Sequence, residues 1–220
     1  MQHICNRPHA KKAGNYAKKK SIRAAEQDRP DVKAKRDVWH DDLKDVDPQR
    51  LVFLDESSIN TSMTRRYGRS PRGQRVIAAV PHGAWKTLTL TAAIRIGGVS
   101  ACAVFDSAMD RLCFESYIEQ LLVPTLSDGD VIIMDNLSAH KSNAVIKAVE
   151  KVGARVLLLP PYSPDFNPIE KMFSKAKEGL RALSERTIPG LMNAIGTVLR
   201  TVTAKDICGW FQSCGYRYKQ

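Results

Sequence analysis

Two aspartates each follow a short apolar run of the kind that forms a buried strand. Asp55 follows residues 51–54, and Asp135 follows residues 131–134. Ligands of α/β proteins bind at the carboxyl ends of strands, so the two carboxylates would face one crevice if these strands are parallel neighbours. Carboxylates held close together repel unless a cation lies between them, and Mg²⁺ is the usual cation beside phosphate substrates. An aspartate at the end of a strand can also be a turn former, so for each residue alone this alternative stays open.

A third carboxylate, Glu170, stands in the tetrapeptide Asn167-Pro168-Ile169-Glu170. Asn is a favourable N-cap and Pro a favourable first helical residue, so a helix is expected to begin here. Glu three residues after an N-cap is also the capping-box position, and this structural role competes with a catalytic one. Helical spacing places further polar residues on the same face as Glu170, namely Ser174, Lys177 and Arg181. Such a face suits a metal site with a phosphate backbone beyond it, or it is simply solvated.

The charge of the chain favours a polyanionic partner. Its 34 Lys and Arg residues exceed its 23 Asp and Glu residues, which gives a formal net charge of +11. Residues 1–23 hold seven basic residues and no acidic one, and a loop-like stretch contains Arg65, Arg66, Arg69, Arg72 and Arg75. Excess positive charge attracts nucleic acid, although solubility alone would also account for it.

Length and composition indicate one cytoplasmic domain. The 220 residues suffice for a full core. The chain contains no apolar run near the ~20 residues that span a membrane, and its first residues lack the apolar region of a signal peptide. Five cysteines without a C-x-x-C pair argue against a structural zinc site. Residues 1–48 are predicted to be a basic tail or linker with a short helix at 21–28, and residues 49–216 the domain.

The apolar patterning of residues 49–216 alternates between strands and helices. Strands are expected at 51–54, 87–94, 99–105, 131–134 and 156–159, with Gly97-Gly98 turning the second into the third. Helices are expected at 112–122, at 145–152, from 168 onward and at 189–201. A hairpin followed by parallel strands and crossover helices predicts an α/β fold, a mixed five-stranded sheet flanked by helices.

Three segments resemble the motifs of the DDE transposases, and within them the bacterial insertion-sequence relatives of the mariner transposases. They are Leu51-Val-Phe-Leu-Asp55-Glu56, the run from Val131 to His140, and Leu159-Pro-Pro-Tyr-Ser-Pro-Asp-Phe-Asn-Pro-Ile-Glu170. Thirty-four residues separate Asp135 from Glu170, a spacing that this branch favours. The resemblance covers about residues 50–216 and implies the RNase H-like fold of retroviral integrases.

The resemblance also implies an activity and a site. Asp55, Asp135 and Glu170 would be the catalytic carboxylates and would hold two Mg²⁺ or Mn²⁺ ions during cleavage and strand transfer at the inverted-repeat ends of an insertion sequence. Asn136 and His140 would assist. We expect DNA contacts from Arg65, Arg66, Arg69, Arg72, Lys177 and Arg181. The competing carboxylates are Glu56, expected on the opposite face of its strand, and Asp106, Asp110 and Asp165.

Complete relatives carry an upstream helix-turn-helix region, and residues 1–48, which precede the predicted domain, show no such pattern. We therefore expect a catalytic half, joined in the cell to a DNA-binding half by ribosomal frameshifting, or else a truncated copy. Inverted-repeat and target DNA, a homodimer on DNA, and a location at the bacterial nucleoid are implied as well. Two alternatives stay open: another RNase H-like nuclease, and a catalytically silent DNA-binding or assembly remnant.

Overall fold

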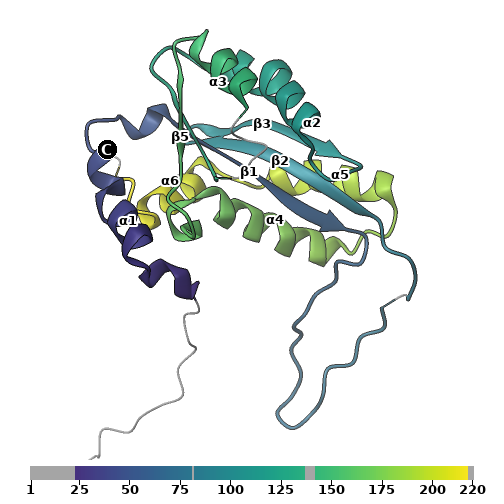
Figure 1. Ribbon diagram of the computed structural model, residues 1–220. Helices are drawn as coiled ribbons and strands as arrows, with labels where there is room; N and C mark the ends of the chain where they lie inside the picture. The colour runs from purple at the N-terminus through teal and green to yellow at the C-terminus, as the bar shows by residue number, and fades with distance from the viewer. Residues whose placement is uncertain (1–22, 81, 137–141, 218–220) are drawn as a thin grey trace, which may run out of the picture.

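The computed structural model describes residues 23–80, 82–136 and 142–217. Its centre is one five-stranded sheet in the order β3-β2-β1-β4-β5 (Figure 1). The strands are β1 Leu51–Asn60, β2 Thr87–Arg95, β3 Gly98–Phe105, β4 Val131–Met134 and β5 Arg155–Leu158. β1, β2 and β3 pair antiparallel, whereas β4 runs parallel to β1 and β5 parallel to β4. This confirms the predicted mixed sheet.

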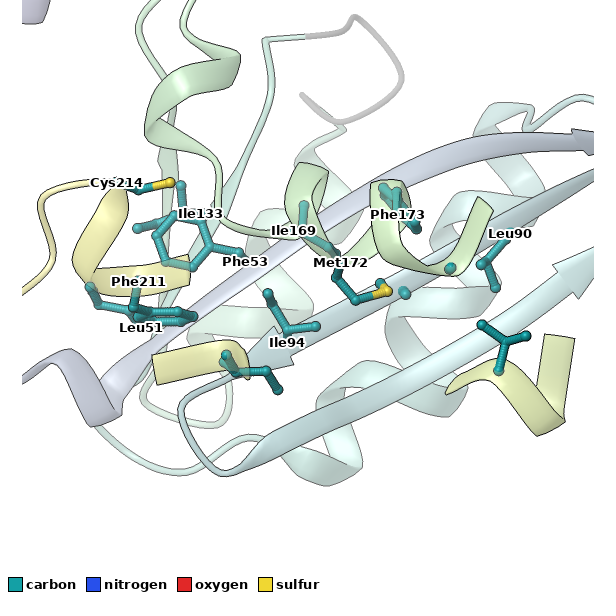
Figure 2. Close-up of a cluster of buried hydrophobic side chains, with 14 of the residues drawn as sticks. Leu51, Phe53, Leu90, Ile94, Ile133, Ile169, Met172, Phe173, Phe211 and Cys214 are labelled. Carbon is teal, nitrogen blue, oxygen red and sulfur yellow. The ribbon is translucent and has the colours of Figure 1, made fainter. Parts of the chain in front are cut away.

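Helices cover both faces of the sheet (Figure 1). On one face lie α2 Arg111–Tyr117 and α3 Asn143–Glu150, and on the other α4 Ile169–Leu183, α5 Ile188–Leu199 and α6 Ala204–Ser213. The short helical turns are Ala25–Asp28, Pro48–Arg50, Ile118–Leu122, Val123–Thr125 and Pro164–Phe166. Each face has its own apolar cluster, and Figure 2 shows the one beneath α4 and α6. None of the described helices has the length and apolar character to cross a membrane.

β1 is longer than its apolar run predicts. The strand was expected to end at Leu54, but it continues through Asp55 to Asn60 because β2 pairs with it along this whole stretch. The parallel pairing with β4, in contrast, extends only to Phe53 and Ile133. Beyond that point no strand among the described residues pairs with this edge of β1, and Asp55 stands near the start of this gap.

The linker predicted for residues 1–48 contains a packed helix, α1, over Pro30–Asp42. Its Trp39 is buried, and the indole Nε1–H donates to the hydroxyl of Tyr216 at 2.8 Å. Only Val32 and Trp39 of α1 are buried, which is too sparse a pattern to show helical periodicity in the sequence. The linker interpretation is therefore wrong for this segment. The short helix predicted at 21–28 is a helical turn at Ala25–Asp28, and its first two residues lie outside the described part of the chain.

A buried ion pair fixes the beginning of β4. Asp130 has no exposed surface, and its carboxylate accepts from Arg95 Nη2 at 3.0 Å and from the Ser127 backbone N–H at 2.9 Å. Arg50, just before β1, lies 3.5 Å away. Since a buried charge is tolerated only when it is paired, these contacts tie the starts of β1 and β4 to the end of β2.

Candidate active site

The pleat of the sheet directs Asp55 and Asp135 toward the same layer of helices. Alternate residues of a strand share a face, and Phe53 and Ile133, two residues earlier, both belong to the cluster under α4 (Figure 2). Phe53 and Ile133 are also direct partners in the parallel register. The two aspartates each follow by two residues, just beyond the last paired positions, and both line one cavity on the α4 side of the sheet.

Glu170 reaches this crevice from the first turn of α4. Ile169, Met172 and Phe173 form the buried face of that helix (Figure 2), which leaves Glu170 on the exposed side of the first turn. The capping alternative is not realised, because the N-cap position of α4 is Pro168 and no side-chain hydrogen bond caps the helix. The sequence predicted Asn167 as this cap, and the structure corrects that assignment.

The three carboxylates line one open cavity of about 540 Å³. Its walls are completed by two amide side chains and by the segment between β5 and α4: Asn136, Asn167, Leu159, Pro160, Pro161, Tyr162, Ser163 and Pro164. The conformation of this segment is unusual, since Tyr162 has a positive φ of 57°. The motif that suggested the resemblance thus forms one wall of the pocket.

Asp55 is held in an electrostatically unfavourable position. Burial raises its pKa to about 7, and the negative charges of Glu170 and Asp135 add to the rise. Its Oδ1 accepts the backbone N–H of Glu56 at 2.7 Å, and its Oδ2 accepts Asn167 Nδ2 at 3.0 Å. These two contacts orient the carboxylate, but they do not supply the positive charge that would stabilise its ionised form.

The donor set suits a hard divalent cation, because such ions prefer carboxylate and carbonyl oxygens. The raised pKa of Asp55 beside two further carboxylates indicates the same need for positive charge. As the side chains stand, no three His, Cys, Asp or Glu residues within 23–80, 82–136 and 142–217 are placed closely enough to hold an ion. Ion binding would therefore require the carboxylates to draw together.

Three of the competing carboxylates have other environments. Asp110 caps α2, where it accepts the backbone N–H of Cys113 at 2.8 Å. Asp106 is exposed and does not line the cavity. Glu56 does not line the cavity, and the alternation of β1 places it on the opposite face of the strand from Asp55.

Asp165, the fourth competing carboxylate, is bound by Arg36 of α1. The guanidinium contacts both oxygens of Asp165 at 3.0 and 2.7 Å, donates to Ser163 Oγ at 2.6 Å and stacks 4.2 Å above the ring of Phe166. The Arg36 side chain is only 15% exposed. A bidentate, half-desolvated and stacked arginine is a stronger contact than an ordinary surface ion pair.

Further hydrogen bonds connect the N-terminal part of the chain to the segment between β5 and α4, which forms one wall of the cavity. Gln27 Nε2 donates to the Tyr162 carbonyl at 2.6 Å. The Tyr216 hydroxyl, itself bound by Trp39, donates to the Phe166 carbonyl at 2.7 Å. Sequence patterns did not indicate these contacts, because the contacts that α1 and Gln27 make to this wall and to Tyr216 join residues more than 120 positions apart along the chain.

The remaining predicted residues occupy different places. Asn136 lines the cavity, and His140 lies outside the described residues. Four arginines are exposed on the segment 61–80 that follows β1 and extends away from the domain (Figure 1): Arg65, Arg66, Arg69 and Arg72. Lys177 and Arg181 are partly buried on α4 and are not part of the cavity wall. The structure thus groups the three carboxylates with Asn136 and separates them from the predicted DNA contacts.

Comparison with known proteins gives a family and a fold. A family model described as DDE superfamily endonuclease matches residues 50–189. Curated protein sequences give no significant match. Among solved structures, the chain is similar to the Mos1 transposase paired-end complex with left transposon end, with 16% identity, a TM-score of 0.72, and coverage of 92% of this chain and 63% of that one.

Two further structures are similar. The mariner Mos1 paired end complex with Mg has a TM-score of 0.72 at 15% identity, with coverage of 95% of this chain and 69% of that one. The catalytic domain of Mos1 mariner transposase has a TM-score of 0.62 at 14% identity, with 88% of this chain and 90% of that one covered. The chain therefore has the RNase H-like fold predicted from its motifs and spans about two thirds of the length of the longer Mos1 chains.

Proposed function

Since the chain belongs to the DDE superfamily of endonucleases, we propose that it is the catalytic domain of a DNA transposase of the bacterial insertion-sequence type. Its reaction would be metal-dependent cleavage and strand transfer at the inverted-repeat ends of the element. One observation carries the proposal: Asp55, Asp135 and Glu170, which lie far apart in the sequence, line a single open cavity beside the gap at the edge of β1.

In this proposal each side chain has a defined task. Asp55, Asp135 and Glu170 would hold two Mg²⁺ or Mn²⁺ ions, which when bound activate a water or a DNA 3′-hydroxyl and stabilise the leaving oxygen. Asp55 is buried and oriented by two hydrogen bonds, so it provides the fixed part of the site. The Glu170 side chain is exposed on the first turn of α4, so it would be the carboxylate that changes its rotamer to reach the ions. Asn136 and His140 would orient the scissile phosphate.

The partner would be DNA. The exposed arginines of residues 65–72 provide positive charge on a loop that extends from the domain, and Lys177 and Arg181 lie further along the helix that carries Glu170. Such contacts to phosphates give affinity without sequence selectivity. An upstream helix-turn-helix half supplied by frameshifting would read the inverted repeats. The chain would act as a homodimer on DNA at the bacterial nucleoid.

The decisive experiment is Mn²⁺-dependent nicking of a duplex that carries the inverted-repeat end flanking the coding sequence. The wild-type chain and three variants are compared: Asp135→Ala, Asp55→Asn and, as a matched control, Asp106→Ala, whose carboxylate is exposed and outside the cavity. Cutting by wild type and the control, with none by the other two, is expected. Cutting retained by Asp55→Asn would refute the assignment of the site.

A second substrate separates the alternative functions. An RNA–DNA hybrid cut in preference to the inverted-repeat duplex would identify a ribonuclease of the same fold. A chain that binds the duplex but neither binds Mn²⁺ nor cuts would be the silent assembly module. The proposed transposase cuts the inverted-repeat duplex and leaves the hybrid intact.

A further inference from the structure

Asn167 occupies an unusual position between the catalytic carboxylates. It precedes α4, and sequence preferences would use its side chain as the N-cap of that helix. Instead its backbone alone makes the local contacts: its N–H donates to the Pro164 carbonyl at 3.1 Å, and its carbonyl accepts from the Glu170 N–H at 3.3 Å. The backbone of Asn167 is thereby fixed on both sides, and its side chain is left to do something other than capping.

The side chain of Asn167 contacts Asp55, 112 residues away in the sequence. Its Nδ2 donates to Asp55 Oδ2 at 3.0 Å, while Glu56 N–H holds the other oxygen. Both oxygens of Asp55 are therefore occupied by neutral donors. A carboxylate with two fixed donors cannot rotate freely, so Asn167 determines how Asp55 is presented to the cavity that both residues line.

This contact has an energetic cost. Asn167 is only 3% exposed, and its Oδ1 is buried without a hydrogen-bond partner within the described part of the chain. An unsatisfied buried acceptor destabilises a fold, and native proteins contain few of them. A leucine of similar size would fill the same space without an unpaired oxygen, but it would leave Asp55 Oδ2 without its donor. The Asn167 amide thus has an unpaired oxygen, and its one side-chain hydrogen bond in the described chain goes from its nitrogen to the buried Asp55 carboxylate. This arrangement is best explained by its effect on Asp55.

We propose that Asn167 is a positioning residue for the metal site: its Nδ2 holds the Asp55 carboxylate in a fixed orientation, toward which Asp135 and Glu170 draw when a divalent cation binds. The inference rests on the proposed function, because it concerns the same pocket. It gives a task to Asn167, a residue of the third motif for which the sequence predicted only a helix cap. Outer contacts that orient ligands of this kind typically change metal affinity or activity 10- to 100-fold.

The test measures Mn²⁺ binding to the metal-free protein by electron paramagnetic resonance of the free ion, without DNA. Asn167→Ala removes the donor, and Asn167→Leu removes the donor while keeping the volume. The control is Asn193→Ala, an exposed asparagine on α5. Both Asn167 variants are expected to bind Mn²⁺ at least about 10-fold more weakly than wild type, with the control unchanged. Urea unfolding of the metal-free proteins is measured alongside. Asn167→Leu loses the hydrogen bond to Asp55 but no longer buries an unpaired Oδ1, so it is expected to unfold at about the same urea concentration as wild type.

A purely structural role for Asn167 predicts the reverse, a loss of stability in Asn167→Leu with normal Mn²⁺ affinity, and that result would overturn the inference. In the nicking assay, the Asn167 variants should need more Mn²⁺ for half-maximal cutting and have lower kcat, with KM for DNA unchanged. If wild type binds Mn²⁺ and the variants bind it equally well, the positioning role alone fails. If wild type binds no Mn²⁺, the proposed function fails and the positioning role with it.

Discussion

Replacing Asp55 by Asn should stabilise the metal-free protein at neutral and alkaline pH. The carboxylate is buried beside Glu170 and Asp135, and its pKa is raised from 3.8 to about 7. A group whose pKa is higher in the folded than in the unfolded chain favours folding fully below the unfolded pKa. That contribution is lost as the pH rises through the folded pKa. The free energy of unfolding of the wild-type protein should therefore fall between about pH 4 and pH 7. In Asp55→Asn this contribution is absent, because the amide carries no charge.

The size of the effect follows from the shift. A difference of about three pKa units corresponds to about 4 kcal/mol at pH 8. Asn offers one acceptor oxygen where Asp55 offers two, so one of the contacts from Glu56 N–H and Asn167 is lost, at a cost of about 1 kcal/mol. The net gain expected for Asp55→Asn is about 3 kcal/mol at pH 8. At pH 4 the gain disappears and the lost hydrogen bond leaves a small deficit.

Urea unfolding followed by circular dichroism at pH 4 and pH 8, in the presence of a chelator, measures this difference directly. Addition of Mn²⁺ at pH 8 should stabilise wild type more than Asp55→Asn, because only the wild-type carboxylate gains a cation. Asp106→Ala, at an exposed site, serves as control and should show neither effect. Equal stability of wild type and Asp55→Asn at pH 8, or a difference that does not change with pH, would refute the electrostatic account of the site.

Three other substitutions test separate features. Asp130→Ala leaves Arg95 without its buried partner and should lower the free energy of unfolding by about 3 kcal/mol in urea titrations. Arg36→Ala should reduce the nicking rate at unchanged KM for DNA. Lys33→Ala, which breaks only an exposed ion pair with Asp37 on the same helix, is the control and should not change the rate. A variant in which four loop arginines are replaced together by Ala should bind any duplex more weakly, and its affinity should depend less on salt, as measured by fluorescence anisotropy. The four positions are Arg65, Arg66, Arg69 and Arg72. A salt slope equal to that of wild type would place the DNA elsewhere.

The sheet and the carboxylate pocket could be predicted because their signals are local. Four consecutive apolar residues precede Asp55 and four precede Asp135, and β4 has the predicted bounds. Period-two alternation then determines which face each aspartate occupies. The extension of β1 to Asn60 could not be predicted in the same way, because residues 55–58 are all polar. Their strand conformation depends on pairing with β2, a contact that the apolar pattern does not encode.

Two helices, α1 and α6, were not predicted from the sequence, and the reasons differ. α6 does carry a local signal, the capping box of Thr203 and Asp206, followed by the buried residues Ile207 and Phe211 one turn apart. That signal would have been sufficient to predict it. α1 has no comparable pattern, because only two of its thirteen residues are buried. It is held mainly by Trp39 and Arg36, whose partners Tyr216 and Asp165 lie more than 120 residues further along the chain.

Asn167 illustrates why local preference fails at the site itself. Its residue type and its place before α4 both predict an N-cap, and in isolation that contact would satisfy the amide oxygen. The folded chain instead uses the amide nitrogen on Asp55 and leaves Oδ1 buried and unpartnered. A sequence usually agrees with its structure at every level, and departures concentrate where function imposes its own requirement. The unmade cap and the raised pKa of Asp55 thus meet at one place: Asn167 gives its amide nitrogen to a carboxylate whose pKa is raised by burial and, in addition, by the charges of Glu170 and Asp135 in the same cavity.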